Sequence, residues 1–374
     1  MLEIYSHNDN PKIKFNGFKE KLLSDYNLAV LSRECSLIGR KEVLSGKAKF
    51  GVFGDGKELP QVVLNHFFKE GDFRAGYYRD QTILMGQNLL TPKQFFSALY
   101  ANPNIKEEPM SGGRQMGAHF GTPSINDRGE WLDLTSKYNH TSDISPTAGQ
   151  IPRSVGLALA SKLYRNINGE IKNKFTRNGN EICWATIGNA STSQGIFFEA
   201  MNAASIIQIP LVMSVWDDGY GISVDNKIQT VKSSISEALS GFSSINDNKP
   251  LKIFRVNGWD YSKMIEVYSE AEEIARKNHI PVLIHIDELT QPLGHSSSGS
   301  HERYKSEERL RWEKEFDCNL KFRQWIIKHN LATDNELNEI EESCKIIVKE
   351  CSKISIKLLF NQKPNPPDSV SVGK

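Results

Sequence analysis

The stretch Ile187–Ser223, which reads IGNASTSQGIFFEAMNAASIIQIPLVMSVWDDGYGIS, decides the fold of this chain. It holds a tight Gly-Asn-Ala turn, a helical segment, a buried apolar strand and then the residues Asp217-Asp218-Gly219-Tyr220. In an open α/β sheet, such a unit puts oxygen-bearing side chains, here Asn189 and Asp218, at the carboxyl ends of two neighbouring parallel strands, where charged ligands bind. A hard divalent cation that holds a diphosphate is the ligand that these oxygens suit best.

The alternation of strand and helix continues on both sides of this stretch. Apolar strand candidates are EICWATIG at 181–188, PLVMSVW at 210–216, KIFRVNG at 252–258 and PVLIHIDEL at 281–289, and helical periodicity covers 193–207 and 261–278. Strand, helix and strand in repetition predict an α/β fold with a parallel sheet that is covered by helices on both faces. We expect this α/β domain over 46–305, a helical leader over 1–45, amphipathic C-terminal helices over 306–360 and a polar, Pro-rich, disordered tail over 361–374.

The bulk properties fit this fold and exclude some classes of function. The chain has 374 residues, a formal net charge of +1 and 39% hydrophobic residues, which suits one large α/β domain with additions or two smaller ones. Near-neutral charge gives no support for nucleic-acid binding, and we expect neither a membrane span nor a signal peptide. The five cysteines have no paired metal-ligand spacing, so reduced thiols in a cytoplasmic protein are expected.

The stretch that decides the fold also resembles the thiamine diphosphate motif. In that motif a Gly-Asp-Gly turn is followed by Asn-Asn, and the α subunits of 2-oxo acid dehydrogenases continue it with Tyr and Ile-Ser. Asn189 stands where the family has its metal-binding Asp, and Asp218, 29 residues later, stands where it has its metal-binding Asn. Tyr220 would supply a main-chain carbonyl to the same Mg²⁺, and Gly188 and Ala190 would lie beside the cofactor.

The two ligand types are therefore exchanged between the two positions. One carboxylate and one carboxamide oxygen still face the cation, so the charge around Mg²⁺ is unchanged. The alternative is that the pair has decayed and the site is dead, but independent decay should not leave the complementary residue in each place. The literal match at Gly54-Asp55-Gly56 has nothing similar to Asn-Asn at the right distance, and it is interpreted as a turn ahead of a helix around 59–68.

Two further segments resemble the family's anion-binding and cofactor-binding strings. In Tyr77-Tyr78-Arg79-Asp80, which precedes a helix expected near Thr82, the resemblance brings Tyr78 and Arg79 to the diphosphate, because the planar fork of Arg matches phosphate oxygens. The alternative is a surface pair between Arg79 and Asp80. In the segment SPTAGQIP at 145–152, Ser145 and Thr147 would contact the aminopyrimidine, although a capped helix start explains the same residues.

Two loops carry histidines that the resemblance makes catalytic candidates. The loop GRQMGAHFG at 113–121 is similar to one in branched-chain 2-oxo acid dehydrogenase α subunits, in which the His faces the substrate channel, so His119 would do so here. The loop GHSSSGSH at 294–301 resembles one that orders over the cofactor, and His295 would bind a diphosphate oxygen and handle the proton during transfer to the lipoyl group. A flexible surface loop is the alternative. Gly299 replaces the usual Asp, and Trp216 replaces a Glu or Arg, so Arg79 and His295 would carry more of the anion binding.

The resemblance runs from about residue 43 to 304 and implies an activity. The chain would be the α subunit, or the α half of a fused chain, of a heterotetrameric enzyme that oxidatively decarboxylates a branched-chain 2-oxo acid or pyruvate and transfers the acyl group to a lipoyl domain of an acyltransferase component. The Glu that activates the cofactor would come from the β subunit, and Glu199 would be structural, so the chain alone should be inactive. A non-catalytic cofactor-binding scaffold and an acetoin dehydrogenase α subunit remain open. The two His loops disfavour a transketolase-type carboligase.

Overall fold

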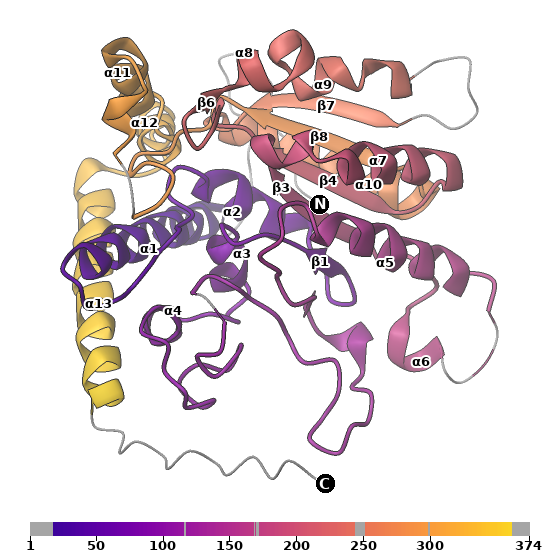
Figure 1. Cartoon of the computed structure of the whole chain (residues 1–374), viewed down its shortest axis with the longest axis horizontal. Helices are drawn as coiled ribbons and strands as arrows, with labels where there is room; N and C mark the ends of the chain where they lie inside the picture. Colours follow the sequence, from indigo (N-terminus) through magenta and orange to yellow (C-terminus); the bar gives the residue numbers. More distant parts are fainter. Residues whose placement is uncertain are drawn as a thin grey trace, which may run out of the picture.

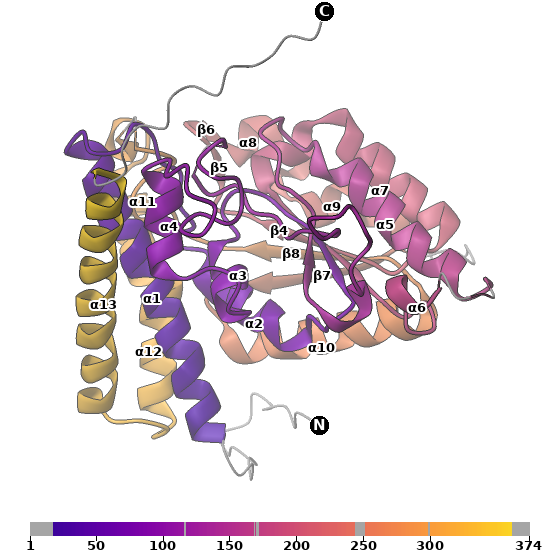
Figure 2. The ribbon, with the colours of Figure 1, turned by 90° about the horizontal axis from the view of Figure 1, so that it is seen from below.

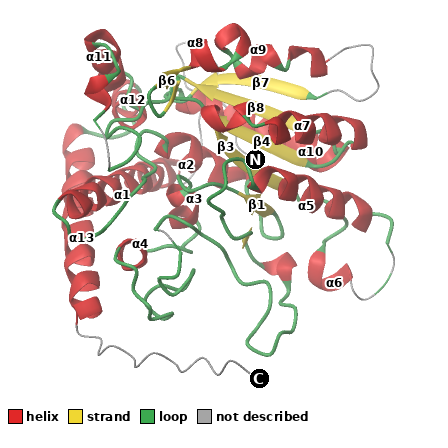
Figure 3. Ribbon diagram, viewed as in Figure 1, coloured by secondary structure: helices red, strands yellow, loops and turns green. Residues whose placement is uncertain are grey.

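A six-stranded parallel sheet forms the centre of the molecule. The computed structural model describes residues 18–115, 117–167, 169, 172–243, 251–297 and 300–360, and the order of the strands in the sheet is β2-β1-β3-β4-β8-β7 (Figures 1 and 3). Every neighbouring pair in this sheet is parallel. The strands are β1 (Phe73–Ala75), β2 (Asn139–His140), β3 (Cys183–Gly188), β4 (Leu211–Trp216), β7 (Lys252–Asn257) and β8 (Val282–Asp287).

Helices cover both faces of this sheet. Figure 2 shows α5 (Gln150–Tyr164) and α7 (Gly195–Ile207) on one face and α2 (Glu58–Phe67) and α10 (Tyr261–Asn278) on the other. Because successive side chains of a strand point to opposite faces, β3 and β4 feed two separate hydrophobic clusters. Trp184 and Val212 belong to one of them, whereas Ala185 and Met213 belong to the other. The α/β fold predicted from the sequence is confirmed, and each of the four predicted strands is present.

The two short strands β1 and β2 were not predicted, and their composition explains why. Arg74, at the centre of β1, has a fully buried side chain that contacts Asp80 and Asp143, each at 2.9 Å. Its Nε also donates to Nδ1 of His140 in β2 at 2.9 Å. Charged and polar residues give no apolar run, and two of the partners that make the burial of Arg74 tolerable, His140 and Asp143, lie 66 and 69 positions away in the sequence.

A group of helices packs beside the sheet, on the left in Figures 1 and 2. It contains α1 (Phe18–Leu44), α11 (Glu307–Glu315), α12 (Cys318–Lys328) and α13 (Asp334–Phe360). The long helix α13 contacts both α1 and α4 (Pro92–Leu99). The chain therefore has helical N- and C-terminal parts, while its division into four segments at 45, 305 and 360 stays a prediction. The expected disordered tail and the first 17 residues of the leader lie outside the described residues.

The remaining α-helices and strands are short. They are α3 (Gln81–Gly86), α6 (Lys172–Phe175), β5 (Tyr220–Gly221), β6 (Val224–Asp225), α8 (Asn226–Gln229) and α9 (Ile235–Ala238). In the described part of the chain, none of the helices has the length and apolar character that crossing a membrane requires.

Candidate active site

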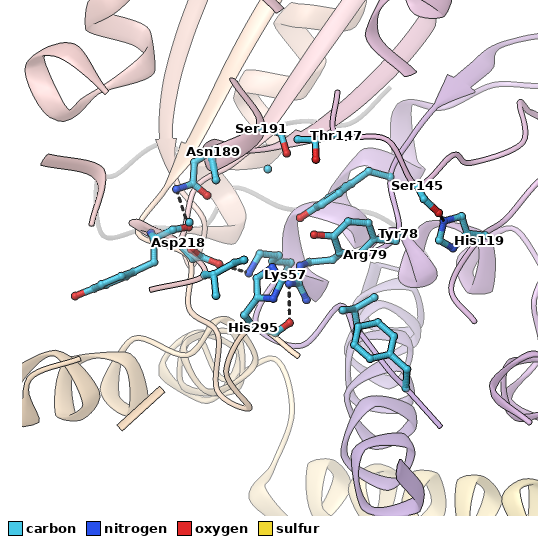
Figure 4. A pocket seen from close by; sticks show the side chains of 18 residues that line it. Lys57, Tyr78, Arg79, His119, Ser145, Thr147, Asn189, Ser191, Asp218 and His295 are labelled. Atoms are coloured by element: carbon cyan, nitrogen blue, oxygen red, sulfur yellow. Dashed lines mark hydrogen bonds and ion pairs between the residues drawn. The ribbon is translucent and has the colours of Figure 1, made fainter. Parts of the chain in front are cut away.

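A pocket of about 350 Å³ lies at the carboxyl ends of β1, β3, β4 and β8. This edge of an open parallel sheet is where ligands are expected to bind. Figure 4 shows side chains from these separate segments converging on the pocket. The structure brings every candidate site residue of the sequence analysis into its lining: Tyr78, Arg79, His119, Ser145, Thr147, Gly188, Asn189, Ala190, Asp218, Tyr220 and His295. Glu199, in contrast, is exposed on α7 and is not among the lining residues.

The end of β3 holds Asn189 in one orientation. Its amide nitrogen donates to the carbonyl of Tyr220 at 3.1 Å and to Oδ1 of Asn226 at 2.8 Å. The amide nitrogen of Asn226 in turn donates to both oxygens of Asp217, at 2.8 and 3.0 Å. Because the Asp217 carboxylate accepts these bonds, the orientation of both amides is fixed. The amide oxygen of Asn189 therefore faces away from this network, toward the interior of the pocket (Figure 4).

Asp218, after β4, is held from two sides. Its Oδ1 accepts from the main-chain N–H of Tyr220 at 3.1 Å, and its Oδ2 accepts from Nζ of Lys57 at 2.8 Å. Burial alone would raise the pKa of Asp218, but the charge and hydrogen bond of Lys57, together with the charges of Lys305 and Arg79, outweigh it and lower that pKa. Asp218 is thus a carboxylate at neutral pH.

Lys57 is a site residue that the sequence analysis missed. Residues 54–56 do form the predicted turn, and α2 begins at Glu58, but the side chain of the intervening lysine lines the pocket and is only 1% exposed. Gly56 permits this because it has a φ of +81° and a Cβ there would lie 2.2 Å from the carbonyl oxygen of Thr290. The carboxylate at Asp218, where the family has a neutral amide, was the one signal in the sequence that a nearby cation is needed.

Arg79 reaches the pocket from the end of β1. Its guanidinium donates to the carbonyls of Phe53 and of His295, the latter at 2.9 Å, and lies 5.2 Å from the centre of the Tyr78 ring. The alternative of a surface pair with Asp80 is wrong, because Arg79 is 3% exposed and Asp80 binds Arg74 instead. Two of the five N–H donors of Arg79 are occupied in these bonds, and the others can bind an anion.

The two histidines lie in different parts of the pocket. His119 contacts Oγ of Ser145 with its Nε2 at 3.0 Å, whereas His295 lies beside Lys57 and Arg79 (Figure 4). Burial, and then the charge of Arg79, lower the pKa of His295 to about 4, so its imidazole is neutral at pH 7. Gly299, the expected departure in this loop, lies outside the described residues. Trp216 is fully buried and donates to Asp80 at 3.2 Å, away from the lining residues.

The donor set of the pocket fits an anchored diphosphate with a hard cation. Arg79 and the neutral imidazole nitrogen of His295 suit phosphate oxygens. The Asn189 amide oxygen, the Asp218 carboxylate and the Tyr220 carbonyl are oxygen types that Mg²⁺ accepts, and these residues would hold the ion. Among the described residues, no cluster of three or more His, Cys, Asp or Glu could hold a metal ion by itself.

Fold and site together define an α/β protein with an anion-binding pocket at the carboxyl edge of its parallel sheet. The chain belongs to the dehydrogenase E1 component family, whose model matches residues 26–359. It is 26% identical to the 2-oxoisovalerate dehydrogenase subunit alpha of Bacillus subtilis over 314 residues, which cover 82% of each chain. It is 25% identical to the pyruvate dehydrogenase E1 component subunit alpha of Rickettsia prowazekii over 348 residues, or 91% of this chain and 93% of that one. The family predicted from the sequence is confirmed.

Proposed function

We propose that this chain is the α subunit, or the α half, of a 2-oxo acid dehydrogenase that uses thiamine diphosphate and Mg²⁺. The complete enzyme would decarboxylate a branched-chain 2-oxo acid or pyruvate and pass the acyl group to a lipoyl domain. Relatives that match most of this chain support the class, and the names of two of them divide between these two substrates. The observation that carries the proposal is that one pocket collects every expected cofactor residue.

The residues of the pocket would divide the work of holding the cofactor. Arg79 and His295 would bind the diphosphate, while Asn189, Asp218 and the Tyr220 carbonyl would hold Mg²⁺ against it. Ser145 and Thr147 line the same pocket and would contact the aminopyrimidine. When bound, thiamine diphosphate supplies the carbon that attacks the 2-oxo group and the electron sink for the loss of CO₂.

The neutral state of His295 suits it for proton handling. An imidazole whose pKa is lowered to about 4 can accept or donate a hydrogen bond without adding a second full charge beside Arg79. His119 lies at the other end of the lining, next to Ser145, and would face the substrate. His295 would thus both bind the diphosphate and handle the proton during acyl transfer, whereas His119 would act at the substrate and the remaining ligands would only anchor the cofactor.

The described lining has no free carboxylate that could activate the aminopyrimidine, and we infer that a partner supplies it. The only carboxylate among the described lining residues is Asp218, which Lys57 and Tyr220 already hold. The acid that activates the aminopyrimidine would therefore come from a β subunit or β half. The test is to titrate thiamine diphosphate with Mg²⁺ calorimetrically and to measure release of CO₂ from 2-oxo acids with and without the β partner. We expect binding and turnover in the complex and no turnover by the chain alone, and full turnover without β would refute the assignment.

A further inference from the structure

The exchange of acid and amide at positions 189 and 218 is accompanied by a third residue. In this chain the negative charge of the pair sits at Asp218 and the neutral amide sits at Asn189. The structure has a buried ammonium, that of Lys57, in contact with the charged member only: its Nζ lies 2.8 Å from Oδ2 of Asp218. The cation comes from a loop 161 positions away in the sequence.

We propose that Lys57 is a positioning residue for the cofactor, and that Asn189, Asp218 and Lys57 form one coupled unit. Lys57 fixes the carboxylate of Asp218 and balances its charge, which allows the acid to occupy the 218 position. The inference rests on the proposed cofactor and goes beyond it, because it assigns a role to a residue outside the metal and phosphate ligands.

The hydrogen bonds of Lys57 hold its ammonium in one position. Its Nζ donates to three acceptors: Asp218, the carbonyl of Thr290 at 3.1 Å and Oε1 of Gln291 at 2.7 Å. Three acceptors require three N–H groups, which only the ammonium has. The amide nitrogen of Gln291 donates to Oδ2 of Asp55 at 3.2 Å, so its oxygen is turned to Lys57. The ammonium is therefore held by its surroundings and does not need a ligand to be ordered.

The same contacts fix Asp218 for a cation. With Oδ2 on Lys57 and Oδ1 on the N–H of Tyr220, the carboxylate plane has one orientation. Each oxygen retains a second lone pair for an ion. A carboxylate that is buried beside an ammonium is stable, but either group alone is an uncompensated buried charge. A return of positions 189 and 218 to the order of the family would thus strand Lys57 beside a neutral amide and next to a divalent cation.

This reasoning predicts a specific pattern of rescue. The variant Asn189→Asp/Asp218→Asn has the ligand order of the family but keeps the lysine, so its ammonium repels Mg²⁺ and the Kd for thiamine diphosphate should rise at least tenfold. The triple variant with Lys57→Met added should recover at least threefold of that loss, because the stranded ammonium is gone. Full recovery is not expected, since Asn189→Asp places a carboxylate against the Tyr220 carbonyl and Oδ1 of Asn226. A residue with a purely structural role would make the triple variant worse than the double one.

The experiment is calorimetric titration of thiamine diphosphate into the full chain, purified with its β partner, at several Mg²⁺ concentrations. Thermal unfolding without cofactor checks that each variant folds, and Lys277→Met, an exposed lysine paired with Glu273, is the matched control with an unchanged Kd. If the exchanged variants do not fold, the single variant Lys57→Met tests the role of Lys57. We expect its Kd for thiamine diphosphate to rise tenfold or more.

The outcomes separate this inference from the proposed function. Wild-type protein that binds no thiamine diphosphate with Mg²⁺ would overturn the proposed cofactor and the role of Lys57 with it. Wild-type binding together with an unchanged Kd in Asn189→Asp/Asp218→Asn, or a triple variant no better than the double, would overturn the role of Lys57 alone. An unchanged Kd in Lys57→Met would do the same.

Discussion

Replacement of Arg79 by lysine tests whether the anion site depends on the guanidinium fork or on charge alone. The substitution keeps one positive charge but removes the planar donor pair. In the structure that pair donates to the carbonyls of Phe53 and His295, and so ties the end of β1 to the loop that carries His295. A lysine Nζ can replace one of these bonds but cannot span both and still face a phosphate.

The magnitude follows from the bonds that are lost. A hydrogen bond from a charged donor contributes about 1.5–3 kcal/mol. Loss of one such bond to the phosphate, with partial release of the His295 loop, should weaken binding by about 2–4 kcal/mol, or roughly 30- to 1,000-fold in Kd. Because Arg79 would touch only the diphosphate end of the cofactor, inorganic diphosphate should lose affinity by the same factor.

The assay is calorimetric titration of both ligands, with Mg²⁺, into wild-type and variant protein. Arg311→Lys, at an exposed position of α11, is the control and should bind both ligands as the wild type does. An Arg79→Lys protein that folds normally and binds within threefold of the wild type would show that the guanidinium only braces the loop. A loss confined to thiamine diphosphate would place Arg79 at the wrong end of the cofactor.

Three further predictions concern His295, Arg74 and Gly56. In the chain without cofactor, NMR should show a pKa of about 4 for the His295 imidazole, because burial and the charge of Arg79 oppose its protonation. Addition of inorganic diphosphate should raise that pKa. A pKa near 6.5 before diphosphate is added would contradict the prediction. Arg74→Met should lower the free energy of unfolding, measured by urea denaturation, by about 3–5 kcal/mol, because it leaves two buried carboxylates without their cation. A decrease of less than about 1 kcal/mol would mean that water reaches these carboxylates. Gly56→Ala should both destabilise the fold and weaken cofactor binding, whereas Gly46→Ala, at a similar φ of +79° but with no atom within 4 Å, should cost only about 1–2 kcal/mol and leave Kd unchanged. Equal effects of the two substitutions would refute the steric argument.

The parts of the fold that the sequence predicted are those with a local signal. The strands β3, β4 and β8 are runs of buried, mostly apolar residues, and such runs are typical of parallel strands covered on both faces. The strand β1 has Arg74 at its centre, and its burial depends on Asp80 and on Asp143, which lies 69 positions later. No local pattern encodes such a pair, so β1 and its neighbour β2 were invisible before the structure.

The residues of the candidate site also fall into those with a local sequence signal and one, Lys57, without such a signal. Its motif residues follow predicted strands or stand in recognisable loops, so their positions at one edge of the sheet could be inferred from the strand order. Lys57 could not be found by this route, because the turn at 54–56 was correctly interpreted as a turn and gave no reason to look at the next side chain. What brings Lys57 to Asp218 is the approach of Gly56 to the carbonyl of Thr290, which is a contact between distant loops.

Asp217 and Asp218, the consecutive acids after β4, face opposite directions, and each orients a different ligand position of the exchanged pair. Asp217 faces the interior, where it accepts from Nε2 of His285 at 2.8 Å and from Asn226. That bond fixes Asn226, which fixes Asn189, so the amide oxygen at the end of β3 is turned to the pocket by a chain of bonds that begins at an acid outside it. Asp218 faces the pocket itself and is oriented by Lys57. The amide at 189 is thus held through Asn226 and Asp217, and the acid at 218 is held by Lys57. The partners at 189 accept hydrogen bonds and the partner at 218 is a cation, so the amide suits the first position and the acid suits the second.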